Sequence, residues 1–141
     1  MVINLIGTTA GALAFLSSAL NWQQVHVGGV WGVHLFASAH TVVDADTLAT
    51  FTAIEASFSG YAVQSPSWSV PALVAGVPTT TSSTVTFSYS GVTTTTIYGV
   101  FVTDALITVM VGAANFASSV ILSPGNPSYV LQISVTSISQ Y

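Results

Sequence analysis

Residues 84–103 read TVTFSYSGVTTTTIYGVFVT, and this stretch decides the fold class. In its first half, 85–89, Val, Phe and Tyr alternate with small hydroxyl side chains, which is the period-two pattern of a strand with one buried face. Ser90-Gly91 then supplies a turn composition. The second half, 97–102, is apolar on both faces, as is 106–111 further along the chain. Such segments are expected to be central strands that are covered twice, or a strand beneath a subunit contact. The stretch therefore predicts strands separated by a turn.

The same pattern of short β-branched and aromatic runs, separated by Gly, Pro, Ser and Asn, extends in both directions. Apolar and polar side chains alternate clearly a second time at 129–135. Residues typical of turns, at 76–78 and 123–127, separate further runs. Eight such runs in about 110 residues predict a mainly β fold, an antiparallel β-sandwich of jelly-roll-like form. The candidate strands are Val30–Ala37, Phe51–Glu55, Phe58–Gln64, Trp68–Leu73, Val85–Tyr89, Thr96–Thr103, Ile107–Phe116 and Tyr129–Ile138.

The N-terminal part of the chain has a different pattern. From Thr9 to Asn21, good helix formers place apolar groups at three- and four-residue spacing, which predicts one short amphipathic helix. Residues 1–20 are apolar, but they lack a positive flank and are interrupted by polar residues and glycines, so a membrane span is disfavoured. We predict a single domain over 1–141, with an N-terminal helix or arm at 1–24 and the β-sandwich at 25–141.

The charge content excludes several classes of function. The chain has 141 residues and no Lys or Arg, and its four acids are Asp44, Asp46, Glu55 and Asp104. Nucleic-acid binding depends on cationic side chains that neutralise phosphates, so a nucleic-acid partner is not expected. Carboxylate clamps and Schiff-base chemistry are lost for the same reason. With no cysteine, the chain has neither a disulfide framework nor a thiolate nucleophile or metal ligand.

The surface of such a chain can carry only a few charges. The sequence is 51% hydrophobic and only 3% charged, whereas a free monomer usually carries a mixed charged surface. Its exterior must consist of Ser, Thr, Asn and Gln together with apolar side chains. We expect neighbouring molecules to cover those apolar side chains, which indicates a subunit of an assembly.

The histidines and acids do not form a recognisable metal or catalytic motif. His26, His34 and His40 lack metal-ligand spacing, so structural or interface roles are favoured over a metal site, and no cofactor is expected. The pair Asp44 and Asp46 lacks the Gly and the bidentate Glu of a calcium loop, which favours capping of backbone N–H groups.

An enzymatic function is not favoured either. The serines lack a nucleophile elbow and a third partner for a Ser and His pair, and the acids are too few for a paired-carboxylate glycosidase. We predict a protein that is not an enzyme and has no catalytic residues. Three Trp and five Tyr could form a carbohydrate-stacking platform, but core and interface packing is favoured for them.

Three segments carry more specific patterns: VHLF at 33–36, FSGYA at 58–62 and TIYGVFVTDA at 96–105. They resemble a family of small tailed-bacteriophage virion proteins, which pair an L-F strand with an F-x-G-Y-A strand and a T-I-Y-G-[YV]-F-V-T-D-A block. The resemblance spans Val33 to Ala117, and the last block is its most specific part. It implies a structural protein of the virion, of the kind that decorates and cements the head, with no catalytic residues.

The resemblance and the low charge together give one leading hypothesis. The chain would form a dimer or trimer on the capsid surface, bound to itself and to the major capsid protein. Two alternatives stay open: a tail, fibre or glycan-binding module of the virion, and a subunit of an extracellular surface fibre. The residues expected at the interface between subunits are Leu13, Leu16, Leu20, Trp22, Trp31, His34 and Phe36.

Overall fold

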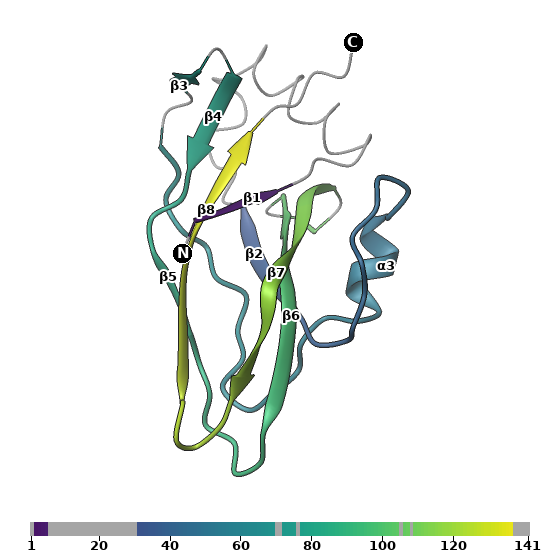
Figure 1. Ribbon diagram of the computed structural model, residues 1–141, viewed down its shortest axis with the longest axis vertical. Coiled ribbons are helices and arrows are strands. Elements are labelled where there is room, and N and C mark those ends of the chain that lie inside the picture. The colour runs from purple at the N-terminus through teal and green to yellow at the C-terminus, as the bar shows by residue number, and fades with distance from the viewer. Residues whose placement is uncertain are drawn as a thin grey trace.

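The computed structural model describes residues 2–5, 31–69, 72–75, 77–104, 106–107 and 109–136, which form two β sheets and one short helix (Figure 1). The mainly β prediction is confirmed. The helix is α3 (Leu48–Thr52). The strands are β1 (Val2–Leu5), β2 (Gly32–Phe36), β3 (Ala72–Val74), β4 (Val77–Thr81), β5 (Val85–Ser88), β6 (Thr95–Thr103), β7 (Met110–Leu122) and β8 (Ser128–Thr136). The predicted helix at Thr9–Asn21 lies outside the described residues.

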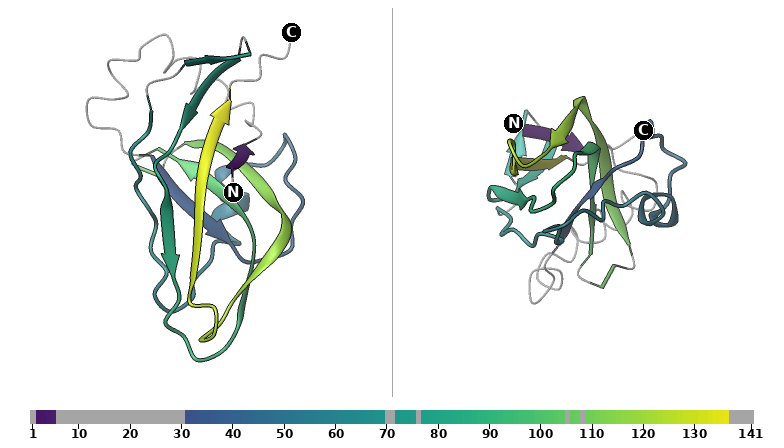
Figure 2. Two further views of the ribbon diagram at one scale, coloured as in Figure 1. Left: turned by 60° about the vertical axis from the view of Figure 1, so that its left-hand side comes forward. Right: turned by 90° about the horizontal axis from the view of Figure 1, so that it is seen from below.

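The larger sheet has the order β1-β8-β4-β3, and β5 also pairs with β8; the smaller sheet has the order β2-β6-β7. The pairs in both sheets are antiparallel, except that β1 runs parallel to β8, which corrects the fully antiparallel prediction. Figure 2, from below, shows the larger sheet, the smaller sheet and α3 as successive layers.

The predicted strand at Phe51–Glu55 is wrong, because α3 and its C-terminal turn occupy this segment. Leu48, Phe51 and Ile54 recur at three-residue spacing, so one face of a helix carries all three apolar side chains. Thr47 precedes the first turn, and its N–H donates to Thr50 Oγ1 at 3.3 Å. A run of five residues is too short for alternation to distinguish a strand from a helix.

The predicted strand at Phe58–Gln64 is also wrong. Tyr61 N–H donates to the Phe58 carbonyl at 3.0 Å, and Gly60 has φ 88°, so the chain turns here. Only Gln64 forms an isolated bridge, with Val33. Two of the eight predicted segments are therefore not strands, and β1 and β4 were not predicted.

Two further predicted strands are displaced. Of the segment predicted at Trp68–Leu73, Trp68 forms an isolated bridge with Ser82, and strand β3 begins at Ala72. The strand predicted from Ile107 begins at Met110, because Asp104 Oδ1 accepts the Val109 N–H at 2.9 Å and holds a turn before it.

The smaller sheet is buried on both faces. On one face, Val33, Leu35, Val100 and Val102 share a hydrophobic cluster with β5 and β8 of the larger sheet. On the other face, α3 covers a second cluster, formed by Phe36, Phe51, Phe101, Met110 and Ala113. The prediction that 97–102 forms a central strand covered twice is confirmed. The same prediction for 106–111 is wrong, because Leu106 and Ile107 are exposed and precede β7, which lies at the edge of the sheet. No helix in the described part of the chain has the length and hydropathy required to cross a bilayer.

Candidate functional site

The centre of the smaller sheet holds a buried polar network around His34, whose side chain is 1% exposed. Its Nδ1 lies 2.7 Å from Glu55 Oε1, and its Nε2 lies 3.0 Å from Thr103 Oγ1. The imidazole stacks on Phe101, with ring centroids 4.5 Å apart. Glu55 Oε1 also accepts a hydrogen bond from the Tyr61 hydroxyl at 2.8 Å. The network therefore joins β2, β6 and the segment 55–61.

The order Glu55, His34, Thr103 reproduces the carboxylate, imidazole and hydroxyl sequence of a hydrolase triad. Thr103 is nevertheless 0% exposed, and its hydroxyl donates to the Asp104 carbonyl at 3.0 Å. A substrate cannot reach a hydroxyl in this position. We conclude that the geometry supports a structural role, in which the network ties three segments together.

Tyr61 completes the network from the side of the turn. Its hydroxyl accepts the Leu35 N–H at 3.1 Å while donating to Glu55. Burial raises the pKa of Tyr61, the Leu35 N–H lowers it, and the Glu55 carboxylate raises it further, so that the pKa lies well above its ordinary value. The phenol therefore stays protonated and remains a donor to Glu55.

A second histidine and carboxylate pair lies in the loop before α3. His40 Nε2 lies 2.9 Å from Asp46 Oδ2, and the same oxygen accepts the Val43 N–H at 2.8 Å. The predicted capping role is therefore confirmed at Asp46. Asn115 of β7 holds this loop as well, because its Oδ1 accepts the Val42 N–H at 2.8 Å.

The loop is expected to loosen in acid. Burial raises the pKa of Asp46, but hydrogen bonds from the Val43 N–H and His40, with the attraction of His40, outweigh it, so that the pKa lies below its ordinary value. Because folding lowers this pKa, the stabilisation is fully present above about pH 4 and is lost as the pH falls through the lower folded value. Chemical shifts of the Val43 amide, followed by NMR from neutral to acidic pH, measure this transition.

Two matched variants test whether Asp46, and not the nearby Asp44, causes this transition. Asp46→Asn is expected to abolish the transition at the Val43 amide, whereas Asp44→Asn should leave it in place. A transition that persists in Asp46→Asn would assign it to another group.

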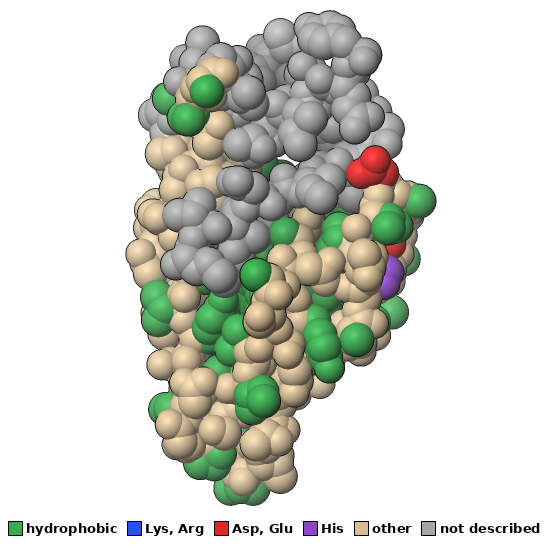
Figure 3. All heavy atoms as spheres, viewed as in Figure 1, with side chains coloured by type: hydrophobic (Ala, Val, Ile, Leu, Met, Phe, Trp, Pro, Cys, Tyr) green, Lys and Arg blue, Asp and Glu red, His purple; other side chains and the backbone are tan. Residues whose placement is uncertain are grey.

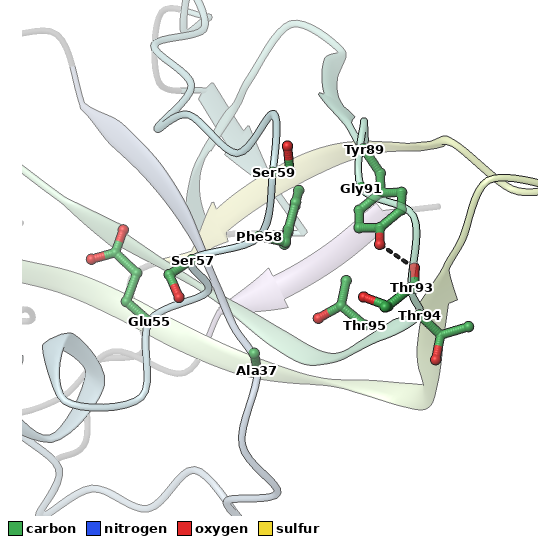
Figure 4. A pocket seen from close by; sticks show the side chains of 10 residues that line it. All are labelled: Ala37, Glu55, Ser57, Phe58, Ser59, Tyr89, Gly91, Thr93, Thr94 and Thr95. Atoms are coloured by element: carbon green, nitrogen blue, oxygen red, sulfur yellow. Dashed lines mark hydrogen bonds between the residues drawn. The ribbon is translucent and has the colours of Figure 1, made fainter.

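A pocket of about 290 Å³ lies between the segment 55–59 and the turn 89–95. Hydroxyl side chains dominate its lining, and Phe58 and Tyr89 supply aromatic rings (Figure 4). The Glu55 carboxylate points away from the other lining residues, as its bonds to His34 and Tyr61 require. The pocket is lined by Ala37, Glu55, Ser57, Phe58, Ser59, Tyr89, Gly91, Thr93, Thr94 and Thr95. The sequence gives no sign of this pocket, because the two segments that form its walls share no motif.

The predicted interface residues need a correction. Trp31, His34 and Phe36 are buried inside the chain, so their side chains do not present a face to a neighbour. Trp31 instead contacts Trp68 edge to face, with ring centroids 5.0 Å apart, as core packing favours. The remaining predicted interface residues, namely Leu13, Leu16, Leu20 and Trp22, lie outside the described residues, as does His26. Among the residues that the structure describes, no three His, Asp or Glu side chains gather around a potential metal position.

The surface carries apolar side chains with few charges around them. Val92 is 91% exposed and Leu106 is 80% exposed. Figure 3 shows hydrophobic side chains scattered among uncharged polar ones over β7 and β8, with acidic and histidine atoms at the edge near α3. The exposed large hydrophobic residues of the described chain are Val43, Val63, Val74, Val92, Leu106, Ile107, Ile121 and Val130.

No protein-family model, no curated protein and no solved structure matches this chain. The geometry of the buried network supports a structural role, and hydroxyl side chains dominate the lining of the pocket. The surface, which exposes large apolar side chains and carries few charges, is therefore the feature from which a function is best inferred.

Proposed function

We propose that this protein is a non-enzymatic structural subunit of a virion, which decorates and cements a bacteriophage head shell. The single observation that carries the proposal is a surface that exposes large apolar side chains in a chain without Lys or Arg. Fully burying a Val, Leu or Ile side chain stabilises by roughly 1.5–3 kcal/mol. Contacts with neighbours would recover this free energy, whereas a lone monomer leaves the side chains in water.

The positions of the most exposed side chains suit a subunit that makes two kinds of contact. Val92 precedes the start of β6, and Leu106 follows its end, so they lie at opposite ends of a strand of nine residues. Such a strand is about 30 Å long. One end can therefore contact the shell while the other meets a further copy, and cyclic symmetry would repeat each contact around the particle.

The arrangement of the sheets and of the motif-bearing segments also supports the proposal. Two sheets that share one hydrophobic cluster suit a β-sandwich, the architecture proposed here for the whole chain. The segments that resemble the virion family also meet in space. Phe36 of VHLF lies opposite Gly99 of TIYGVFVTDA, and the Tyr61 hydroxyl of FSGYA accepts the Leu35 N–H. The resembling motifs thus form one packing unit.

The low charge suits attachment to a shell under varied conditions. Interfaces between uncharged surfaces are little affected by salt, because few charges are present to be screened. The proposed partners are further copies of this chain, as a dimer or trimer, and the major capsid protein.

Sedimentation velocity and particle binding test this function. The purified protein is expected to form a closed dimer or trimer whose stability changes little with salt, and to bind shells in hundreds of copies. Val92→Asn and Leu106→Asn should each weaken self-association or shell binding by at least about tenfold, which corresponds to about 1.4 kcal/mol. Thr86→Asn, on the exposed face of β5, is the matched control and should change neither.

Three other results of these experiments would contradict the proposed role as a head decoration protein. A handful of copies at the tail would indicate a tail or fibre component, and filaments of purified protein would indicate a surface fibre. A stable monomer with no affinity for a shell would exclude assembly altogether.

A further inference from the structure

The pocket between 55–59 and 89–95 has walls that are fixed before any ligand arrives. Ser90 N–H donates to the Ser59 carbonyl at 2.9 Å, and the two serine hydroxyls lie 3.0 Å apart. On the opposite wall, the Tyr89 hydroxyl donates to the Thr93 carbonyl and closes the turn (Figure 4). A preformed site avoids the entropic cost of ordering its walls when a ligand binds.

The lining offers hydroxyl groups for recognition. In the described part of the chain, the side-chain hydroxyls of Ser57, Thr93, Thr94 and Thr95 have no hydrogen-bond partner, although they line the same pocket. Each hydroxyl can donate one hydrogen bond and accept others. A ligand rich in hydroxyl groups, which also both donate and accept, matches this set.

The pocket also has an apolar wall. The Phe58 ring packs edge to face on Tyr61 at 5.1 Å and lies 5.8 Å from the Tyr89 ring, so its position is held from two sides. Small-molecule sites typically combine such an aromatic surface with a few polar groups that fix orientation. A sugar ring presents both an apolar C–H face and a rim of hydroxyls.

The pocket offers no cationic side chain to an anionic ligand. The chain contains no Lys or Arg that could bind a phosphate or carboxylate. The one carboxylate at the pocket, on Glu55, is directed away from it and accepts hydrogen bonds from His34 and Tyr61. From the hydroxyl lining, the aromatic wall, the lack of any cationic side chain and a volume of about 290 Å³, we propose that this pocket binds one uncharged sugar ring. Binding of this kind is independent of the assembly role proposed above.

Ligand-observed saturation-transfer NMR tests the proposal with the full chain, because the method works for monomers and large assemblies alike. The probes are the methyl glycosides of glucose, galactose, mannose and N-acetylglucosamine, with glucuronic acid and glycerol as charged and acyclic comparisons. At least one neutral glycoside is expected to bind with a millimolar dissociation constant, and more tightly than glucuronic acid or glycerol.

Variants then assign the binding to this pocket. The double variant Thr94→Val and Thr95→Val removes two hydroxyls while keeping the shape of the side chains, and should weaken binding about tenfold. Thr86→Val, an equal substitution on β5 outside the pocket, should leave binding and the thermal midpoint unchanged. The proposal is overturned if no neutral glycoside gives saturable transfer, or if the double variant binds as tightly as the parent chain.

Discussion

Replacing Gly99 with alanine is expected to lower the free energy of unfolding by about 3 kcal/mol. Gly99 lies in β6 between Phe36 of β2 and Asn115 of β7. A methyl group at this position would overlap both the Ala114 carbonyl oxygen and the Phe36 ring. The carbonyl belongs to the backbone of a paired strand and cannot rotate away, so the sheet itself must shift. The φ of Gly99 is not positive, so the cost comes from crowding alone.

Urea denaturation of both proteins measures this loss. Gly125→Ala is the control, because a methyl group there would meet only the Ser123 hydroxyl at 3.9 Å, and its effect should stay within about 0.5 kcal/mol. The double variant Gly99→Ala and Phe36→Leu tests the ring as the obstruction. It should lose less stability than the sum of the two single variants, because the shorter side chain leaves room for the methyl group. Equal urea midpoints for Gly99→Ala and the parent chain would contradict the close packing of Gly99 against Phe36 and Ala114.

Strands with a long, regular burial pattern were the best predicted from the sequence, whether one face or both faces are buried. Along 85–88 of β5 the burial alternates residue by residue, because the pleat of a strand directs successive side chains to opposite faces. The segment 97–102 was also predicted correctly as a strand, because a sheet with a hydrophobic cluster on each face needs apolar residues on both faces. In both cases the pattern extends over enough residues to identify its period.

Predictions failed where a few local residues decide between structures. At Phe51–Glu55, five residues fit a helical face as well as an alternating strand, and the second core cluster favours the helix. At Phe58–Gln64, the positive φ of Gly60 turns the chain within an apolar, aromatic run. In the first case, burial against the smaller sheet selects the helix, and a single sequence does not show which layer a segment packs on. In the second case, the backbone conformation of one glycine decides.

The candidate site shows the same division between local and distant contacts. The capping of Val43 by Asp46 spans three residues and could be expected from composition. The partners of His34 are 21 and 69 residues away along the chain, so no spacing rule could join Glu55 and Thr103 to it. The sheet registers that bring them together, His34 opposite Phe101 and Phe36 opposite Gly99, appear only in the structure.

Replacing His34 with alanine is expected to lower the free energy of unfolding by about 3 kcal/mol or more. The substitution leaves the Thr103 hydroxyl without its imidazole partner, removes one of the two partners of Glu55 Oε1, the other being the Tyr61 hydroxyl, and opens a cavity beside Phe101. His40→Ala is the matched control, because it also removes a histidine beside a carboxylate. The His40 side chain is 28% exposed, and pairs near the surface contribute only about 0–1 kcal/mol. Chemical denaturation of both variants gives the comparison.

A third variant separates the polar contribution of His34 from its packing. His34→Phe fills the space of the imidazole and can still stack on Phe101, but it has no ring nitrogen to hydrogen-bond with Glu55 or Thr103. Since buried polar groups that lose their partner cost about 1–3 kcal/mol, this variant should remain destabilised by about 2 kcal/mol. His34→Asn keeps a donor near the Nδ1 position and should recover part of that loss. If His34→Phe were as stable as the parent chain, the network would contribute nothing to stability, and packing alone would hold β2 to β6.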